Sequence, residues 1–240
     1  MEQAGLSRVE GPPLAQEPGQ GAHTIGGYVR EVAGRYGPRE AVVLRKGEQR
    51  TAWTYDDLLA RSMEVARALV ACGIGKGEPI GILMTNRPEF LSSLFGAALA
   101  GAVPVALSTF STPQELGHML RASNVSLLLY EARVLKKDFG AMLRELEPGI
   151  ASARRGALSS VSFPYLRWLV ALGGAPGEAE PFAVEAGGAV ETWDEFLAHG
   201  EEVPDELVLA RADAVHPADP GGVFFSSGTT SQPKGVVHSQ

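Results

Sequence analysis

A run of hydroxyl residues, glycines and one lysine lies near the end of the 240-residue sequence. It reads Ser226-Ser227-Gly228-Thr229-Thr230-Ser231-Gln232-Pro233-Lys234-Gly235 and follows a hydrophobic segment at 222–225. Glycine lets successive backbone N–H groups turn toward an anion, because it has no Cβ in the way. Hydroxyl groups can donate further hydrogen bonds to phosphate oxygens, and Lys234 adds a positive charge. The run therefore predicts a phosphate-binding loop.

Two other interpretations of this run have to be weighed. Counted from Gly228, a Walker A loop would have its lysine at Lys234, but Pro233 precedes that lysine and Gly235 follows it. The hydroxyl that binds metal in a P-loop NTPase is therefore missing. A simple Ser/Thr/Gly turn between two strands, with a surface lysine, would explain any three of these residues. It explains the whole ordered run less well.

The run resembles the phosphate-binding signature of the AMP-binding, adenylate-forming superfamily, which includes acyl-CoA synthetases, luciferases and peptide-synthetase adenylation domains. Ten positions match that signature: Phe225, Ser226, Ser227, Gly228, Thr229, Thr230, Pro233, Lys234, Gly235 and Val236. Upstream stretches are similar to the family's N-terminal subdomain in the expected order, at 54–58, 86–90, 101–105 and 122–124. The resemblance covers about residues 24–240 and identifies residues 23–240 as an incomplete AMP-binding domain.

The resemblance implies an enzyme that binds ATP with Mg²⁺ and a carboxylic acid, forms an acyl-adenylate and transfers the acyl group to coenzyme A. It assigns the ATP phosphates to nine residues: Ser226, Ser227, Gly228, Thr229, Thr230, Ser231, Gln232, Pro233 and Lys234. Lys234 is the catalytic candidate, because it can neutralise charge on the departing pyrophosphate. The sequence does not indicate the metal ligands.

Ser231 departs from the signature, which has glycine at this position. If that glycine has a positive φ, serine costs about 1 kcal/mol and can shift the loop. Serine still brings an N–H and a hydroxyl, so no phosphate donor is lost. We expect Ser231→Gly to improve ATP affinity or leave it unchanged.

The acid itself is not indicated by these residues. A fatty or other apolar acid is the first choice, an amino acid the second, and a non-catalytic nucleotide-binding or interaction fragment the alternative from another class. By resemblance, later segments supply a threonine/glutamate motif for metal, an aspartate for the ribose and a lysine for the α-phosphate. No stretch of this sequence matches them, so we expect the fragment alone to be inactive.

The elements that would position the run alternate between helix and strand from Thr51 onward. Capping patterns predict helices that begin at Thr54, Asn86, Thr112 and Thr192. Apolar runs predict strands at 80–84, 103–107, 125–130, 166–172, 222–225 and 235–238. The first three strands start about 23 residues apart, as short βαβ units require. The predicted fold is α/β, with a parallel sheet and helices on both faces.

Between these elements, residues 148–165 are expected to form a loop or loose insertion, and 175–188 a Gly/Pro-rich connection. Asp213 and Asp219 are interpreted as turn formers. His238, on the strand that leaves the run, is expected to pack or to lie at the surface rather than to act in catalysis.

The net charge of −7 offers no basic excess for nucleic acid or anionic lipid. Cys72 is the only cysteine, which excludes an intrachain disulfide and a zinc cluster built from cysteines, and it reads as a small hydrophobe near a helix end. Residues 1–22 predict a disordered arm without a signal peptide. The uncharged stretch 90–114 is broken by Gly101 and Pro104, so no membrane span is expected. The cytoplasm is the expected compartment, and the oligomeric state is not indicated.

Overall fold

The computed structural model describes residues 21–173, 188–226 and 232–240. Their main feature is a seven-stranded sheet in the order β11-β10-β4-β3-β5-β8-β9. All neighbours in it are parallel except β10 and β11, which are antiparallel. The strands are β3 (Pro79–Leu83), β4 (Val103–Ala106), β5 (Leu127–Glu131), β8 (Trp168–Leu172), β9 (Val190–Thr192), β10 (Pro220–Ser226) and β11 (Lys234–Ser239). The predicted parallel sheet is confirmed.

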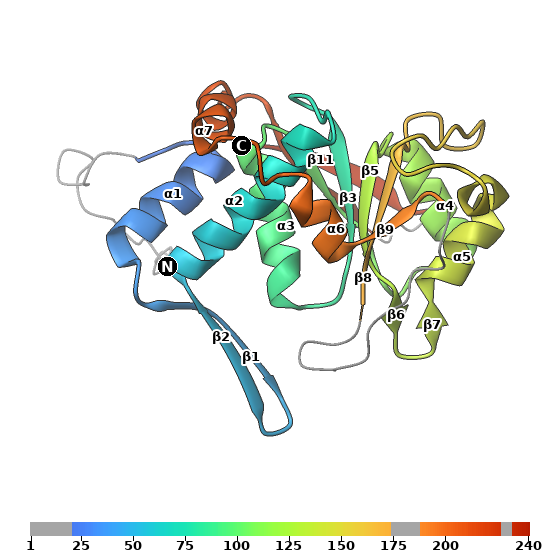
Figure 1. The fold of residues 1–240 in the computed structure, drawn as a ribbon, viewed down its shortest axis with the longest axis horizontal. Coiled ribbons are helices and arrows are strands. Elements are labelled where there is room, and N and C mark those ends of the chain that lie inside the picture. The colour runs from blue at the N-terminus through green and yellow to red at the C-terminus, as the bar shows by residue number, and fades with distance from the viewer. Residues whose placement is uncertain (1–20, 174–187, 227–231) are drawn as a thin grey trace, which may run out of the picture.

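Helices cover both faces of this sheet (Figure 1). They are α1 (Ile25–Tyr36), α2 (Tyr55–Ala71), α3 (Pro88–Leu99), α4 (Pro113–Ala122), α5 (Phe139–Leu146), α6 (Trp193–Ala198) and α7 (Asp205–Asp213). A 3₁₀ turn spans Pro148–Ala151. Two small hairpins lie outside the sheet, formed by β1 (Glu40–Lys46) with β2 (Gln49–Thr54), and by β6 (Arg133–Val134) with β7 (Lys137–Asp138).

The two faces carry two separate hydrophobic cores, because successive strand residues point to opposite sides. Ile80 and Ile82 of β3 face the core shared with α2, α3, α6 and α7. Leu128 and Tyr130 of β5 face the other core, shared with α4 and α5. Strands buried on both faces form continuous apolar runs rather than an alternating pattern. The apolar runs in the sequence therefore predicted the positions of these buried strands.

Capping boxes fix the starts of three helices. Thr54 with Asp57, Thr112 with Glu115, and Thr192 with Glu195 each make the reciprocal pair of side chain-to-backbone bonds. Each threonine oxygen accepts from the third helical N–H, and each carboxylate accepts from the threonine N–H. The predicted starts at these three threonines are confirmed.

Close contact between α2 and α3 depends on small side chains. A Cβ placed on Gly96 would lie 2.7 Å from the Cβ of Val65 and 2.9 Å from the carbonyl oxygen of Ser62. No residue larger than glycine fits there without a shift of one helix. Glycine at position 96 therefore permits the close approach of α2 and α3.

Several predictions are wrong in detail. The N-cap of α3 is Arg87, not Asn86, and no side chain caps that end, although Pro88 does begin the helix. Asp213 ends α7 and pairs with Arg30 at 2.6 Å, so it is not a turn former. Asp219 does form a turn, since it accepts from the N–H of His216.

The loop at 148–165 is packed rather than loose. Ile150, Leu158 and Phe163 are buried in the core beneath α4 and α5. Most of the predicted arm, 1–20, and most of the predicted connection, 174–187, lie outside the described residues.

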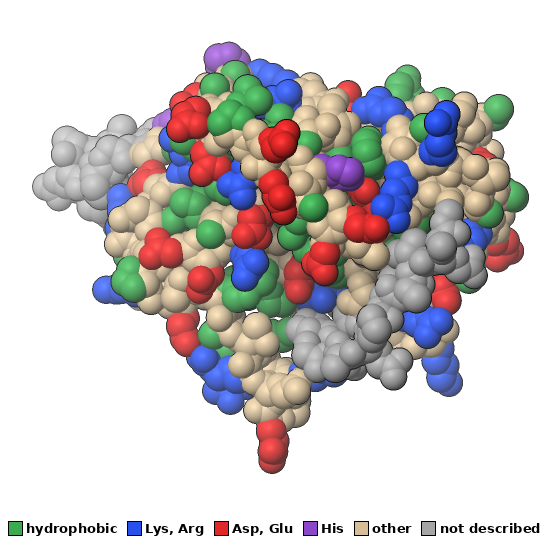
Figure 2. All heavy atoms as spheres, in the orientation of Figure 1, with side chains coloured by type: hydrophobic (Ala, Val, Ile, Leu, Met, Phe, Trp, Pro, Cys, Tyr) green, Lys and Arg blue, Asp and Glu red, His purple; other side chains and the backbone are tan. Residues whose placement is uncertain are grey.

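Acidic and basic side chains are interspersed over the face seen in Figure 2.

The uncharged stretch 90–114 divides into part of α3, then β4, then the start of α4. No helix in the described ranges combines the length and apolarity needed to cross a bilayer.

Candidate ATP-phosphate site

The predicted phosphate-binding run connects two antiparallel strands at one edge of the sheet. Ser226 ends β10, Lys234 begins β11, and their Cα atoms are register partners. Directly opposed residues of an antiparallel pair present their side chains on the same face. The structure thus brings together the first and last residues that the sequence assigned to phosphate.

The predicted residues Ser227, Gly228, Thr229, Thr230 and Ser231 lie outside the described part of the chain. Gln232 is exposed and Pro233 is half-buried. Lys234 and Ser226 are both exposed, so each side chain is available to a ligand.

β10 holds one end of the run firmly. Val223 and Phe224 pair in parallel with Val105 and Ala106 of β4. Val223 and Phe225 pack against the core beneath α4 and α5. The carboxyl end of β10 therefore has a fixed position relative to the carboxyl ends of β4 and β3, which lie at the same edge. In open α/β sheets, ligands bind outside this edge, where the connecting helices change from one face to the other.

His118 of α4 holds the other end of the run. Its Nε2 atom lies 3.1 Å from the carbonyl oxygen of Pro233, the residue before Lys234. The tautomer with its proton on Nε2 donates a hydrogen bond to that oxygen. Sequence reasoning missed this residue, because no local pattern links two positions 115 residues apart.

Nearby at the same edge, the connection between β4 and α4 is tied down by a lysine. Lys137 Nζ donates to the carbonyl oxygens of Thr109, at 3.0 Å, and Ser111, at 2.8 Å. These bonds fix the segment that leads into the capping box of α4, and hence the helix that carries His118.

A buried charged network closes the carboxyl ends of β3 and β5. Glu131 accepts from the N–H and the hydroxyl of Thr85 at 3.0 and 2.7 Å, and pairs with Arg87 at 3.3 Å. Arg87 also pairs with Glu89 at 2.8 Å. Arg87 and Glu131 are each only 6% exposed, so these bonds satisfy charges that would otherwise be costly to bury.

The described residues at this edge do not fit a magnesium ion. Mg²⁺ prefers carboxylate and water oxygens in octahedral geometry. The carboxylates of Glu131 and Glu89 are engaged by Thr85 and Arg87, and that of Glu115 caps α4.

A surface hollow of about 510 Å³ lies beside the sheet, but not at the phosphate-binding run. Tyr28, Leu94, Phe95 and Phe224 contribute its apolar lining. Ser226, Gln232, Pro233 and Lys234 are not among the residues that line it. His238 lies at the surface, with its ring centroid 5.5 Å from that of Phe224 in an edge contact.

The known proteins that resemble the chain in sequence include CoA ligases. It is 30% identical over 229 residues to the acyl-CoA ligase SID4 of Ajellomyces capsulatus, covering 95% of this chain and 35% of that protein. It is 31% identical over 232 residues to the 3-hydroxybenzoate–CoA ligase of Aromatoleum sp. (strain CIB), covering 95% and 33%. The chain thus spans about a third of the length of these curated relatives.

The fold is shared with solved structures of CoA ligases. The anthranilate CoA ligase AuaEII, solved with anthranoyl-AMP, matches with a TM-score of 0.65 and 21% identity, over 90% of this chain and 34% of that one. The model of the family described as AMP-binding enzyme matches residues 29–240. The match includes the hairpin that joins Ser226 to Lys234 and the sheet that supports it. The chain belongs to the AMP-binding enzyme family.

Proposed function

We propose that this chain supplies the ATP-phosphate-binding part of an enzyme that activates a carboxylic acid as an acyl-adenylate and passes the acyl group to coenzyme A. The observation that carries the proposal is the opposition of Ser226 and Lys234 at the carboxyl edge of the sheet. Membership of the AMP-binding family and the ligase relatives support it.

In the proposed reaction, a carboxylate oxygen attacks the α-phosphorus of ATP. The bond from that phosphorus to the oxygen bridging to the β-phosphate breaks, and pyrophosphate leaves. The sulfur of coenzyme A then attacks the acyl carbon, AMP leaves, and the thiol proton passes to solvent. No general base is needed for the first step, because a carboxylic acid is already ionised at neutral pH.

Lys234 acts in the first step by stabilising charge that develops on the β- and γ-phosphates. The backbone N–H groups of Ser227, Gly228 and Thr229 cradle the phosphates. The hydroxyls of Ser226, Thr229, Thr230 and Ser231 donate to them.

The proposed acid is apolar, either a fatty acid or an aromatic one. The named substrate of the 31% identical relative, 3-hydroxybenzoate, supports a largely apolar acid. An amino acid is the second candidate. A non-catalytic nucleotide-binding or interaction module is the alternative from another class, and the proposed location is the cytoplasm.

The test is acid-dependent exchange of pyrophosphate into ATP, measured in a polypeptide of the relatives' length that contains this sequence. Fatty, aromatic and amino acids are compared, and apolar acids should support exchange. Lys234→Ala should lower the exchange rate on the order of tenfold to a hundredfold, since a charge-assisted contact contributes about 1.5–3 kcal/mol. Lys136→Ala, at an exposed lysine on the β6–β7 turn, is the matched control.

Unchanged exchange in the Lys234 variant would refute the role of this lysine. Exchange with amino acids alone would overturn the apolar substrate. Binding of ATP without exchange for any acid would favour the non-catalytic module.

A further inference from the structure

Three side chains of types that bind metals lie close together beside β9, the outer strand on the opposite side of the sheet from β11 and the phosphate-binding run. Cys72, Glu191 and His199 each offer one ligand atom, and these atoms lie within 4.8 Å of one another. Cys72 follows the last residue of α2, Glu191 lies in β9, and His199 follows α6. β9 and β11 are the two outer strands of the sheet, so this group is separate from the site already described.

Glu191 is the unusual member of the group. It is completely buried. Its Oε2 lies 2.9 Å from Nε2 of His199. Its Oε1 is also buried and has no hydrogen-bond partner in the part of the chain that the structure describes. Buried carboxylate oxygens in proteins are nearly always hydrogen-bonded, paired or bound to a metal, so Oε1 is open to a bound cation.

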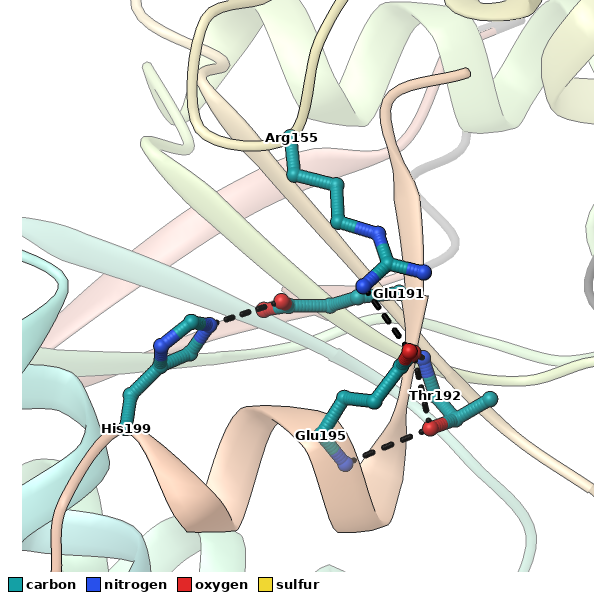
Figure 3. A network of polar contacts seen from close by, with 5 residues as sticks. All are labelled: Arg155, Glu191, Thr192, Glu195 and His199. Atoms are coloured by element: carbon teal, nitrogen blue, oxygen red, sulfur yellow. Dashed lines mark hydrogen bonds and ion pairs between the residues drawn. The ribbon is translucent and has the colours of Figure 1, made fainter. Parts of the chain in front are cut away.

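The neighbouring guanidinium of Arg155 does not donate a hydrogen bond to that oxygen. Figure 3 shows Glu191 directed toward His199, while Arg155 reaches past it to Glu195. Arg155 Nη1 lies 2.8 Å from Glu195 Oε1, and Thr192 binds the other oxygen of Glu195. The guanidinium is therefore engaged by the exposed carboxylate rather than the buried one.

The frame around the group is tightly packed. The end of α6 lies so close to α2 that a Cβ on Gly200 would come within 2.6 Å of the amide nitrogen of Ala68. The ring of His199 makes an edge contact with Trp168 at 5.5 Å between centroids. The three ligands thus belong to three elements whose relative positions are fixed.

We propose that Cys72, Glu191 and His199 bind one Zn²⁺ ion, through the thiolate, a carboxylate oxygen and the imidazole. These are the three ligand types that zinc takes in proteins, at about 2.0–2.3 Å from the metal. Donors of a tetrahedral zinc site lie about 3.5 Å apart, so the present spacing of up to 4.8 Å has to contract by little more than an ångström. Hard cations such as Mg²⁺ prefer oxygen ligands alone and do not suit this set.

Binding converts the thiol to a thiolate. Burial, and to a lesser extent the nearby Glu191 carboxylate, raise the pKa of Cys72 to about 12, so the metal-free thiol is protonated at neutral pH. A coordinated thiol is deprotonated. One sulfur–zinc bond forms as one proton leaves to solvent, and no oxidant or reductant is needed.

The fourth coordination position faces solvent and takes water. The side chain of His199 is 41% exposed, while Glu191 and Cys72 are buried, so the group opens outward on the histidine side. The ion would link α2 to the consecutive elements β9 and α6, which come much later in the sequence, and would stabilise their contact.

The test uses the 240-residue chain, freed of metal and titrated with Zn²⁺ against a chromophoric chelator. One ion per chain should bind, with release of about one proton from the thiol. Cys72→Ala and Glu191→Gln should each weaken affinity on the order of a hundredfold or more, since loss of even an outer partner of a ligand costs about ten- to a hundredfold. His216→Ala, at an exposed histidine outside the group, should have no effect.

Co²⁺ gives a second measurement that does not depend on any variant. The unaltered chain with Co²⁺ should show a thiolate-to-metal charge-transfer band in the near ultraviolet. Absence of that band, absence of stoichiometric zinc binding, or zinc affinity that survives Glu191→Gln in a folded variant would each overturn the proposal.

Discussion

Lys234 and Ser226 show how a charge is placed at the single-residue scale. Both side chains are exposed, and Lys234 forms no ion pair with any residue that the structure describes. Their positions come from the backbone, because they are register partners in the β10–β11 pair. A slip of one residue would turn Lys234 to the opposite face of the sheet. Exact strand pairing is therefore as important for the proposed phosphate contact as the lysine itself.

The sequence located both ends of the run but not the side chain that anchors it. The spacing of hydroxyls, glycines and lysine is a local pattern, so it can be found from the sequence alone. The bond from His118 to Pro233 depends on how α4 packs beside β10, which no local pattern specifies. Glu131 and Arg87 escaped notice for the same reason, since each becomes part of a network only when β3 and β5 pair.

Replacement of His118 by phenylalanine should weaken ATP binding without unfolding the chain. One neutral hydrogen bond contributes about 0.5–1.5 kcal/mol, so the affinity for ATP should fall about two- to tenfold. The measurement is the KM for ATP in the exchange assay, or direct binding of a fluorescent ATP analogue.

The control for that variant is His238→Phe, at the surface histidine on β11 that makes ring contact with Phe224. Equal losses in the two variants would indicate a general effect on the hairpin. An unchanged KM in His118→Phe would show that the bond to Pro233 does not hold the run for nucleotide.

At the scale of elements, the helices divide into those with strong start signals and those formed by packing. α2, α4 and α6 begin with capping boxes, and the sequence predicted all three. α1, α5 and α7 were not predicted. α1 contains Gly26, Gly27 and Gly34, which oppose helix formation in isolation. Gly26 nonetheless allows α1 to approach α3 closely. A Cβ placed on Gly26 would lie 3.3 Å from the carbonyl oxygen of Ala98 in α3.

α7 escaped prediction because few of its side chains are buried. Only Val208 and Ala212 lie in the core, and the rest of the helix is largely polar. Ion pairs also join it to other helices, from Asp213 to Arg30 and from Asp205 to Arg67, each at 2.6 Å. Contacts of this kind become visible only when the elements are assembled.

Removal of one capping box should destabilise the whole chain by a measurable amount. Thr54→Ala deletes the cap of α2, whose inner face includes Leu58, Val65 and Leu69 of the core. We expect the free energy of unfolding to fall by about 1 kcal/mol, the usual cost of losing an N-cap threonine. Urea denaturation measures it.

The matched variant for this test is Thr109→Ala, because Thr109 caps no described helix. It should change stability much less than Thr54→Ala does. Identical losses in the two variants would mean that the cap of α2 contributes nothing beyond the general effect of a Thr-to-Ala change.

At the scale of the whole molecule, four separated carboxyl groups respond to acid in the same direction. Hydrogen bonds from backbone N–H groups lower the pKa of Asp57, Glu115, Glu195 and Asp219 below the ordinary values of 3.8 for Asp and 4.5 for Glu. A lowered folded-state pKa contributes stability above the ordinary value and loses it as the pH falls through the folded-state value. These groups belong to α2, α4, α6 and the turn before β10.

The urea midpoint should therefore fall as the pH is lowered from about 4.5 toward 3. Glu191 acts in the opposite sense, because burial raises its pKa. Its contribution is present below 4.5 and is lost as the pH rises through the folded-state value. Glu191→Gln should remove that loss, so the variant's midpoint should decline less than the parent's on raising the pH from 4.5 to 7. A urea midpoint of the parent chain that stays constant between pH 5 and 3 would contradict the stabilising role of the four carboxylates with lowered pKa.

The pairing of Ser226 with Lys234 also has an entropic consequence. A flexible segment loses conformational freedom when its ends are brought together, and this loss grows with its length. Here the ends are already joined by the β10–β11 ladder in the folded chain. The cost of bringing Ser226 and Lys234 together is thus part of folding rather than of nucleotide binding. A substitution that weakens the pairing of β10 and β11, for example at the partners Val223 and Val237, would leave Ser226 and Lys234 less firmly held together. ATP binding would then have to bring them together, at a cost in conformational entropy. Its signature would be a less favourable entropy of ATP binding, with every phosphate contact still present.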